Sequence, residues 1–428
     1  MKVVMKWSVI AMAVAAGTSQ LAFASAQSES KGFVEDADLN LLLRTTYFNR
    51  DFKDGDPDRR SLGQGFITKF ESGFTQGTIG VGVDAWGILG VRLDGGRGRN
   101  YPAMFEFESD GDPVHDVSQA GAAIKARFSN TVIKYGNQFP SMPVLAYDDS
   151  RLLPESFTGT LVTSKEIEGL ELNVGRFTAD SSMASPARDT FISSIDGTLK
   201  SINVYGGTYA FTDNLSASLY YADNDDIAKK KYANVNYVLP LHSEQSLSFD
   251  FNIYKTKYDN ETIPNAYFDE ADQGDDNTIW SLAAKYSVGA HAFIVAHQRV
   301  SGDAGYVYDI GDGGSTIWVA NSYYSDFNRK DEHSWQASYE LDFSTFGAPG
   351  LSWKTAYVYG DNIDTPTGEG KEREFFNQVR YVVQSGPVKD MSFKLRNSIY
   401  RSNGTLRDAG SPDLNEIRAF IEYPLSIL

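Results

Sequence analysis

Hydrophobic and polar residues alternate with a period of two along most of the chain. Across residues 39–50, Leu41 and Leu43 fall on one face, and Asn40 and Arg44 fall on the other. Successive side chains of a β-strand point to opposite faces, so this spacing predicts strands with one apolar and one polar face. The same alternation returns in later segments, at residues 215–221, 247–254, 334–343 and 416–425.

Turn residues separate these segments, and short and long connections alternate. The eight short connections lie at 75–77, 129–130, 168–169, 212–214, 240–245, 288–290, 344–350 and 385–389. The nine long ones lie at 51–63, 87–118, 138–158, 179–199, 222–229, 257–277, 301–330, 361–372 and 402–414. Together they predict about eighteen strands, an even number as in bacterial single-chain barrels. Residues 316–324 also resemble a strand, but counting them would break the alternation, so we place them inside the long connection 301–330.

A soluble β-sandwich would show the same period of two. A closed barrel in a membrane is favoured by the alternating loop lengths, by an export signal and by aromatic residues near strand ends. Only closure leaves no unpaired backbone group in lipid. We therefore predict an all-β fold, a transmembrane antiparallel β-barrel of about 18 strands with long extracellular loops. The aromatic residues expected at the membrane interfaces are Tyr47, Trp86, Tyr135, Tyr221, Trp280, Trp353, Tyr357 and Tyr423.

The N-terminus has the features of a secretory signal peptide. Lys2 and Lys6 are followed by a short apolar stretch at 9–16 and by small residues, so cleavage is expected after Ala24 or Ala26. The apolar stretch is shorter than the ~20 residues that a spanning helix needs, which disfavours a membrane anchor. The sequence thus predicts a signal peptide at 1–26 and a single barrel domain at 27–428, exported through the periplasm to the Gram-negative outer membrane.

Composition excludes several other functions. The net charge of −17 argues against nucleic-acid binding, and the absence of cysteine excludes disulfides and thiolate zinc sites. None of the five histidines lies near a serine in a nucleophile-elbow pattern, so the alternative of a serine-type barrel hydrolase is disfavoured. Only about a dozen residues separate the predicted cleavage site from Leu39, which leaves no room for a plug domain. We predict no enzyme activity, no metal and no cofactor.

If the apolar face meets lipid, the polar face lines the lumen. Its basic residues come from roughly strands one to five and fifteen to eighteen, which closure makes contiguous, whereas the middle strands offer mainly Ser, Asn, Tyr and Asp. A row of cations lowers the energy of an anion at each step without trapping it, and guanidinium groups match carboxylates. Pairing with lumen carboxylates such as Glu71, Asp84 and Glu416 is the alternative role. The basic residues are Arg44, Arg50, Lys69, Lys125, Arg127, Lys134, Lys354, Arg380, Lys394, Arg396 and Arg418.

Several long strings carry a family resemblance. They include LNLLLRTTYFNRDF at 39–52, SGFTQGTIGVGVDAWGILGVRLDGGRGR at 72–99, LPESFTGTLVTSKEIEGLELNVGRF at 153–177 and YVVQSGPVKDMSFKLRNSIYRSN at 381–403. They resemble the OprD family, the substrate-specific outer-membrane carboxylate channels. The resemblance implies an eighteen-stranded barrel whose loops three and seven fold into the lumen, where a ladder of basic residues faces an acidic pocket.

In this sequence, the ladder that the resemblance implies corresponds to the basic lumen residues named above. Asp303, at the start of the seventh loop, is the first candidate for the acidic side, followed by Asp148 and Asp149. The predicted function is passive diffusion of small carboxylates, which are amino acids or aromatic or aliphatic organic acids. The expected partners are these solutes and outer-membrane lipid, with a monomeric pore or a loosely associated oligomer. The preferred carboxylate stays open.

Overall fold

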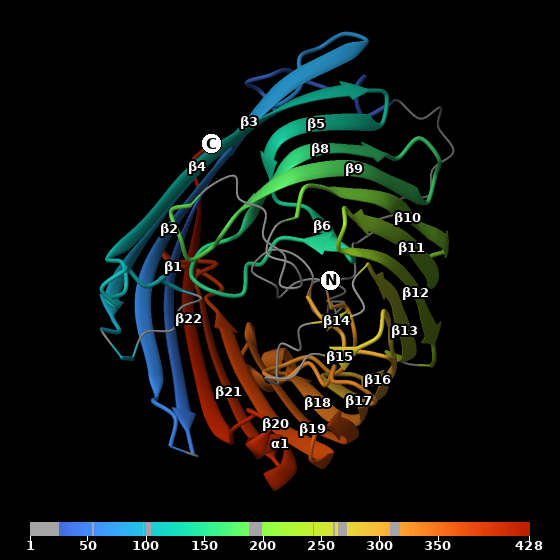
Figure 1. Ribbon diagram of the computed structural model, residues 1–428. Helices are drawn as coiled ribbons and strands as arrows, with labels where there is room; N and C mark the ends of the chain where they lie inside the picture. The colour runs from blue at the N-terminus through green and yellow to red at the C-terminus, as the bar shows by residue number, and fades with distance from the viewer. Residues whose placement is uncertain are drawn as a thin grey trace.

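The computed structural model describes residues 25–53, 55–96, 98–99, 104–187, 199–242, 244–259, 262–263, 272–308 and 317–428. Within these residues, eighteen antiparallel strands form one sheet that closes on itself, because the first strand pairs with the last (Figure 1). The predicted closed barrel is therefore confirmed. Residues 1–24 of the predicted signal peptide lie outside the described ranges.

The barrel strands follow one another around the ring in chain order. They are β1 (Asp38–Phe52), β2 (Arg59–Glu71), β3 (Ile79–Asp94), β4 (Asp116–Phe128), β5 (Thr131–Gln138), β8 (Ser156–Ser164), β9 (Leu170–Ser181), β10 (Ile202–Thr212), β11 (Leu215–Asn224), β12 (Ala228–Pro240), β13 (Gln245–Tyr258), β16 (Asp276–Val288), β17 (His291–Gly302), β18 (His333–Asp342), β19 (Leu351–Thr365), β20 (Gly368–Val382), β21 (Ser392–Ser402) and β22 (Leu414–Ser426).

Shorter elements lie in the connections. Loop three, residues 139–155, contains the pair β6 (Ser141–Met142) and β7 (Leu145–Ala146), and β6 lies inside the ring (Figure 1). The sixth loop contains β14 (Thr262–Ile263) and β15 (Asp272–Gln273). A 3-10 helix, η1 (Phe343–Phe346), and a helix, α1 (Gly404–Asp408), complete the elements. No helix in the described ranges is long and apolar enough to cross a membrane.

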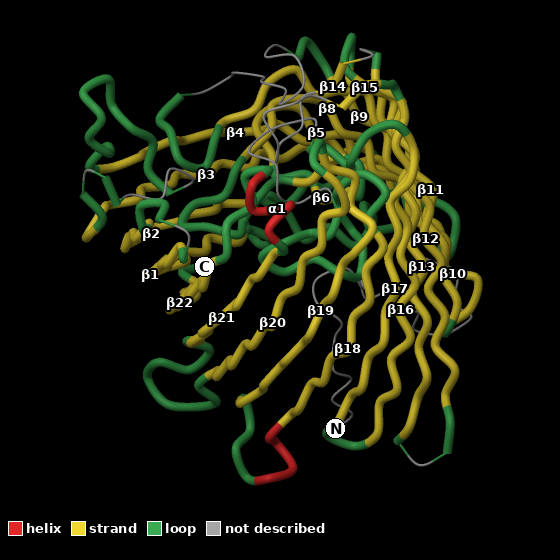
Figure 2. The backbone as a smooth tube through the Cα atoms, turned by 60° about the horizontal axis from the view of Figure 1, so that its bottom comes forward, coloured by secondary structure: helices red, strands yellow, loops and turns green. Residues whose placement is uncertain are grey.

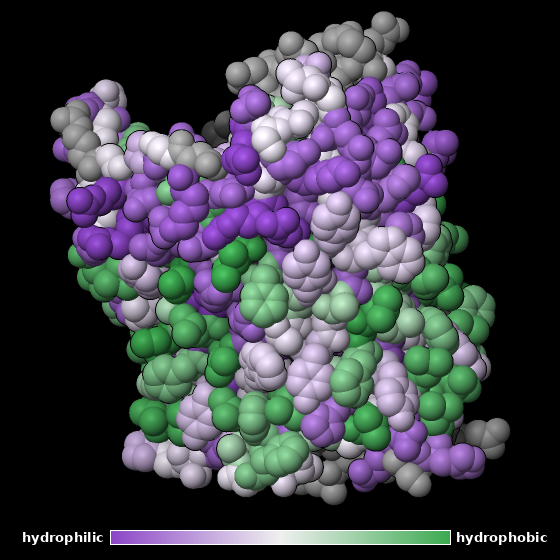
Figure 3. Space-filling model, turned by 90° about the horizontal axis from the view of Figure 1, so that it is seen from below, coloured by the Kyte–Doolittle hydropathy of each residue, from purple (hydrophilic) through white to green (hydrophobic). Residues whose placement is uncertain are grey.

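The outer wall is apolar over a continuous band. Large side chains such as Leu219, Val295, Leu395 and Ile421 are exposed to the surroundings. Figure 3 shows one side of the barrel, with a hydrophobic band and a hydrophilic region above it. So large an exposed apolar surface is not found on soluble monomers, but it matches the hydrocarbon band of about 25 Å on outer-membrane barrels.

Short turns gather at one end of the barrel and the longer loops at the other (Figure 2). Residues 317–324 form no strand and belong to the loop between β17 and β18, as predicted. The predicted long connection 361–372 is wrong: β19 continues to Thr365 and β20 begins at Gly368. A bulge at Asn362, with φ of 61°, lets the polar strand ends keep pairing beyond the membrane.

Trp86 is a second correction. The sequence placed it at the membrane interface, but its side chain is 7 % exposed and its ring centroid lies 5.4 Å from that of Phe139 in loop three. Trp86 shares the inward face of β3 with Gly82 and Asp84, which are also buried. Nearness to a strand end therefore did not reveal which face of the strand carries the ring.

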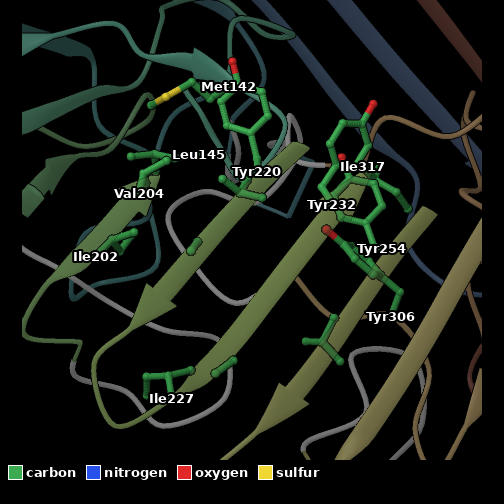
Figure 4. Packing of buried hydrophobic residues seen from close by; sticks show 14 of the residues in the cluster. Met142, Leu145, Ile202, Val204, Tyr220, Ile227, Tyr232, Tyr254, Tyr306 and Ile317 are labelled. Atoms are coloured by element: carbon green, nitrogen blue, oxygen red, sulfur yellow. The ribbon is translucent and has the colours of Figure 1, made fainter. Parts of the chain in front are cut away.

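An apolar core lies inside the barrel against one wall (Figure 4). The wall contributes Tyr220, Tyr232 and Tyr254 from β11, β12 and β13. Loop three contributes Met142, Val144 and Leu145, whereas loop seven, residues 303–332, contributes Tyr306 and Ile317. The two loops are thus packed onto the wall that carries few charges, and loop three also packs through Leu152 and Leu153 in a second apolar cluster with Phe48 of β1 and Phe420 of β22.

Candidate functional site

All eleven predicted basic residues lie on the inward face of their strands. On β1, for example, Arg44, Thr46 and Phe48 are buried, whereas the residues between them are less so. Cross-strand register places Arg396 opposite Arg418 and Lys394 opposite Arg380. Since β1 pairs with β22, the cations from β19–β22 and those from β1, β2, β4 and β5 form one wall of the lumen.

Arg44 holds loop three in place. Its side chain forms an ion pair with Asp149 at 2.6 Å and another with Glu422 of β22 at 2.8 Å. It also donates to the carbonyl oxygen of Leu152 at 3.5 Å, and the whole residue is 4 % exposed. Its donors are occupied by the protein, so Arg44 acts as an anchor for the loop that narrows the lumen.

Three inward carboxylates each bind two inward cations, at least one of which belongs to the wall. Glu416 pairs with Arg50 at 2.6 Å and with Arg418. Each such triad keeps one net positive charge, so the wall stays cationic in spite of the pairing. The other two are Asp84, which pairs with Lys125 at 2.6 Å and Lys134 at 2.5 Å, and Glu340, which pairs with Lys285 at 2.9 Å and Lys354 at 3.4 Å.

Other cations have no carboxylate within salt-bridge distance among the described residues. Lys394 lies 4.1 Å from the ring centre of Phe420, and Arg396 lies 5.1 Å from that of Phe376. Arg380 is exposed to the lumen. A cation over an aromatic face keeps its hydrogen-bond donors free for a solute. These three residues are adjacent on β20 and β21 and form what we call the open cation group.

Lys69 and Arg127 likewise have no carboxylate within salt-bridge distance in the described part of the chain. Lys69 lies 4.0 Å from the ring centre of Phe139 in loop three. Arg127 donates to the side-chain oxygen of Gln27 at 2.9 Å, in the segment before β1, and lies 4.2 Å from the ring of Phe74. Lys69 and Arg127 belong to the same wall as the open cation group.

Loop seven contacts this wall from the side of β20. The backbone amides of Tyr324 and Ser325 donate to Glu374, both at 3.0 Å, and the Tyr323 ring lies 4.4 Å from that of Phe376. Asp326 of the same loop accepts from Ser322 and Tyr308, and burial raises the pKa of its carboxyl group. Loop seven therefore covers the strands next to the open cation group.

The acidic residues proposed from sequence have different positions. Asp303 is exposed where β17 ends, and its backbone amide donates to the carbonyl oxygen of Asp276 at 2.9 Å at the rim. Asp303 thus begins loop seven at the rim, and its role as the acidic side of a constriction stays a prediction. Asp148 is buried and accepts from Ser150 N at 2.7 Å, whereas Asp149 binds Arg44. Within the described ranges, the carboxylates that pair with wall cations are Asp149, Asp84, Glu340, Glu416 and Glu422.

Two inward residues escaped the sequence reasoning. Lys285 on β16 and Lys230 on β12 are buried, and Lys230 donates to the Tyr306 hydroxyl at 3.2 Å. Both have the inward parity, which a complete reading of their strands would have shown. Tyr254 of β13 joins the two loops: its hydroxyl donates to the carbonyl oxygen of Pro143 and accepts from the Trp318 amide, each at 3.0 Å. Only the folded loops could reveal that contact.

A closed barrel with an apolar outer band and a cation-lined lumen is a pore of an outer membrane. The chain belongs to the OprD family: the family model described as "outer membrane porin, OprD family" matches residues 31–427. Porin D of Pseudomonas aeruginosa is 46% identical to this chain, over 99% of the chain and 100% of the relative.

Solved structures agree with this assignment. The crystal structure of Acinetobacter baumannii OccAB1 has a TM-score of 0.88 and 40% identity, and the match covers 95% of this chain and 100% of that one. The structure of Pseudomonas aeruginosa OpdK with vanillate has a TM-score of 0.81 and 32% identity, covering 92% and 100%. The protein is therefore a substrate-specific porin of the Gram-negative outer membrane that passes small solutes. Its relatives are channels, and they give no support to the hydrolase alternative.

Proposed function

We propose that the solutes are small carboxylates and that they pass along the basic wall, with the open cation group as their main contact. The observation that carries this proposal is the set Arg380, Lys394 and Arg396, which is inward-facing and without a carboxylate partner among the described residues. Amino acids and aromatic or aliphatic organic acids all fit the chemistry. OpdK, solved with vanillate, is a relative whose structure contains an aromatic carboxylate, which supports the class.

The two kinds of cation have different roles in this proposal. Arg44 positions loop three, and the triads around Glu416, Asp84 and Glu340 supply a shallow positive potential. The open cation group supplies donors that a carboxylate can exchange one at a time, which permits passage without a deep binding site. The core of Tyr220, Tyr232 and the two loops packs against the opposite wall, so in this proposal the solutes pass on the side of the open cation group.

The test is the triple variant Arg380→Gln, Lys394→Gln, Arg396→Gln. At about 6 Å in water each cation stabilises an anion by about 0.7 kcal/mol, so removing three weakens anion partitioning by about 30-fold. We expect the reversal potential in planar bilayers under a salt gradient to shift toward cation selectivity, and uptake of a panel of labelled carboxylates into liposomes to fall.

The control carries the same charge change away from the lumen. Lys200, Lys229 and Lys257 are exposed and paired with Asp226, Asp259 and Asp275, and their replacement by glutamine should leave selectivity unchanged. Equal selectivity in the open-cation variant and the wild type would contradict the proposed path. The uptake panel also ranks the carboxylates.

We also propose that the signal peptide is removed and that a single chain forms the pore. The Ala26 amide donates to the Asn130 side chain at 2.7 Å and the Gln27 amide to the Ser129 carbonyl at 3.1 Å, which favours cleavage after Ala24 over Ala26. Intact-mass measurement of the purified protein distinguishes a start at Ser25 from one at Gln27. The same measurement under native conditions gives the oligomeric state.

A further inference from the structure

A row of two tyrosines and two lysines crosses the outer wall of four neighbouring strands. Tyr205 of β10 pairs with Tyr221 of β11, Tyr221 with Lys231 of β12, and Lys231 with Lys255 of β13. These strands lie side by side in the ring (Figure 1). Both lysines are exposed, whereas the residues next to them in sequence, such as Lys230 and Tyr254, are buried in the lumen. The row therefore points away from the pore.

The two lysines of the row lack compensation within the protein. They face each other directly across β12 and β13, and among the described residues neither has a carboxylate within salt-bridge distance. The next lysine pair toward the loops is compensated, because Lys229 pairs with Asp259 at 3.6 Å and Lys257 with Asp275 at 2.9 Å. Like charges directly opposite each other in a sheet are destabilising. An anion bound from outside would remove that cost.

The row lies at the outer edge of the hydrocarbon band. Lys231 precedes Leu241, in the turn at the other end of β12, by ten residues. With a rise of about 3.3 Å per residue and a tilt of about 40°, that distance corresponds to about 25 Å in height, the thickness of the apolar band. The residues between them that face outward, Val235, Tyr237 and Leu239, are exposed. The lysine amines thus lie at the level of the outer-leaflet headgroups.

An apolar hollow adjoins the lysines. It has a volume of about 470 Å³ and is lined by Tyr205, Leu219, Tyr221, Ile253 and the stems of Lys231 and Lys255. Leu219 is 69 % exposed, although it lies on the membrane side of the row. The stacked rings of Tyr205 and Tyr221, with centroids 6.3 Å apart, border the hollow. Cations, aromatic faces and an open apolar surface therefore meet at one place.

We propose that this surface binds one phosphorylated glycolipid of the outer leaflet, of the lipid A type. A phosphate of the headgroup lies between the Lys231 and Lys255 amines, the sugar rests on Tyr205 and Tyr221, and an acyl chain occupies the hollow beside Leu219. The argument for this occupant is charge complementarity together with depth, because anionic headgroups and acyl chains meet at the level of the row. The site is separate from the pore and does not depend on the solute proposed above.

The test compares the double variant Lys231→Gln, Lys255→Gln with the wild type in detergent by native mass spectrometry, with bis-phosphorylated lipid A as the probe. Each cation near an anionic lipid contributes about fivefold in affinity, so we expect binding of one lipid A per chain to weaken about 25-fold. The variant Lys231→Arg, Lys255→Arg should retain binding. Single-channel conductance in planar bilayers establishes that each variant is folded.

The matched control is Lys200→Gln with Lys371→Gln, which removes two lysines that are paired with Asp226 and Glu369. It should bind lipid A as the wild type does, and dephosphorylated lipid A should bind weakly to all variants. Inorganic phosphate at millimolar concentration should not displace the lipid, because it cannot fill the hollow. Equal lipid A affinity in the wild type and the glutamine variant, displacement by phosphate alone, or a lysine-dependent dimer in place of a lipid adduct would each overturn the proposal.

Discussion

The hydroxyl group of Tyr254 connects both inward loops to the barrel wall. It donates to the carbonyl oxygen of Pro143 in loop three and accepts from the amide of Trp318 in loop seven, each at 3.0 Å, and the residue is fully buried. The substitution Tyr254→Phe removes this one oxygen. It keeps the ring, whose centroid lies 4.6 Å from that of Tyr232 and 5.5 Å from that of Tyr306. The change therefore isolates the hydrogen bonds from the packing.

The expected cost follows from the two partners that lose their hydrogen bond. A buried polar group left unpaired costs about 1–3 kcal/mol, and nearby lumen water can recover part of that, so we expect about 2–4 kcal/mol for the docking of the loops. Since 1.4 kcal/mol is a factor of ten, the ratio of docked to undocked loops falls by about 30- to 1,000-fold. The strand ladder is untouched by the substitution.

Single-channel recording in planar bilayers measures this effect. We expect Tyr254→Phe to spend at least about tenfold more time in states of higher or fluctuating conductance, while the heat-modifiable mobility of the barrel stays unchanged. The control is Tyr237→Phe, which removes a hydroxyl from an exposed ring on the outer wall. Current traces of Tyr254→Phe that match the wild type, or an equal change in the control, would refute the role of this contact.

Two further substitutions test the loops. Arg44→Met leaves Glu422 and the half-exposed Asp149 without their partner. We expect this change to weaken the docking of loop three by about 2–3 kcal/mol and to let trypsin cleave the loop at Arg151. An uncut loop in folded protein would contradict the anchor role of Arg44. Burial raises the pKa of the Asp326 carboxyl group, so docked loop seven binds a proton more tightly than undocked loop seven does. The docking of loop seven therefore weakens as the pH rises from about 4, the ordinary pKa of an aspartate, through the raised pKa. Channel noise should therefore increase as the pH is raised above about 4, and Asp326→Asn should flatten that slope. An unchanged slope would be evidence against Asp326 as its source.

The sequence alone determined much about this protein. The period of two predicted the membrane band and the inward face of eleven basic residues, and the alternation of short and long connections predicted the strand number. Closure followed because lipid leaves no partner for an unpaired strand edge. That period is a local consequence of strand geometry, and lipid requires the apolar face to be outside. Two predictions were wrong. Nearness to a strand end did not show that the Trp86 ring faces the lumen, and the polar character of segment 361–372 did not show that β19 and β20 continue into it.

Tertiary structure decided which cations are available to a solute. Arg44 and Arg396 have the same sequence signal, yet Arg44 is held by Asp149 and Glu422, whereas Arg396 lies against Phe376. Glu422 is 378 residues from Arg44 along the chain, and it reaches the guanidinium only because β1 closes on β22. Ion pairing depends on separations of a few ångströms, which only the closed barrel and its folded loops set.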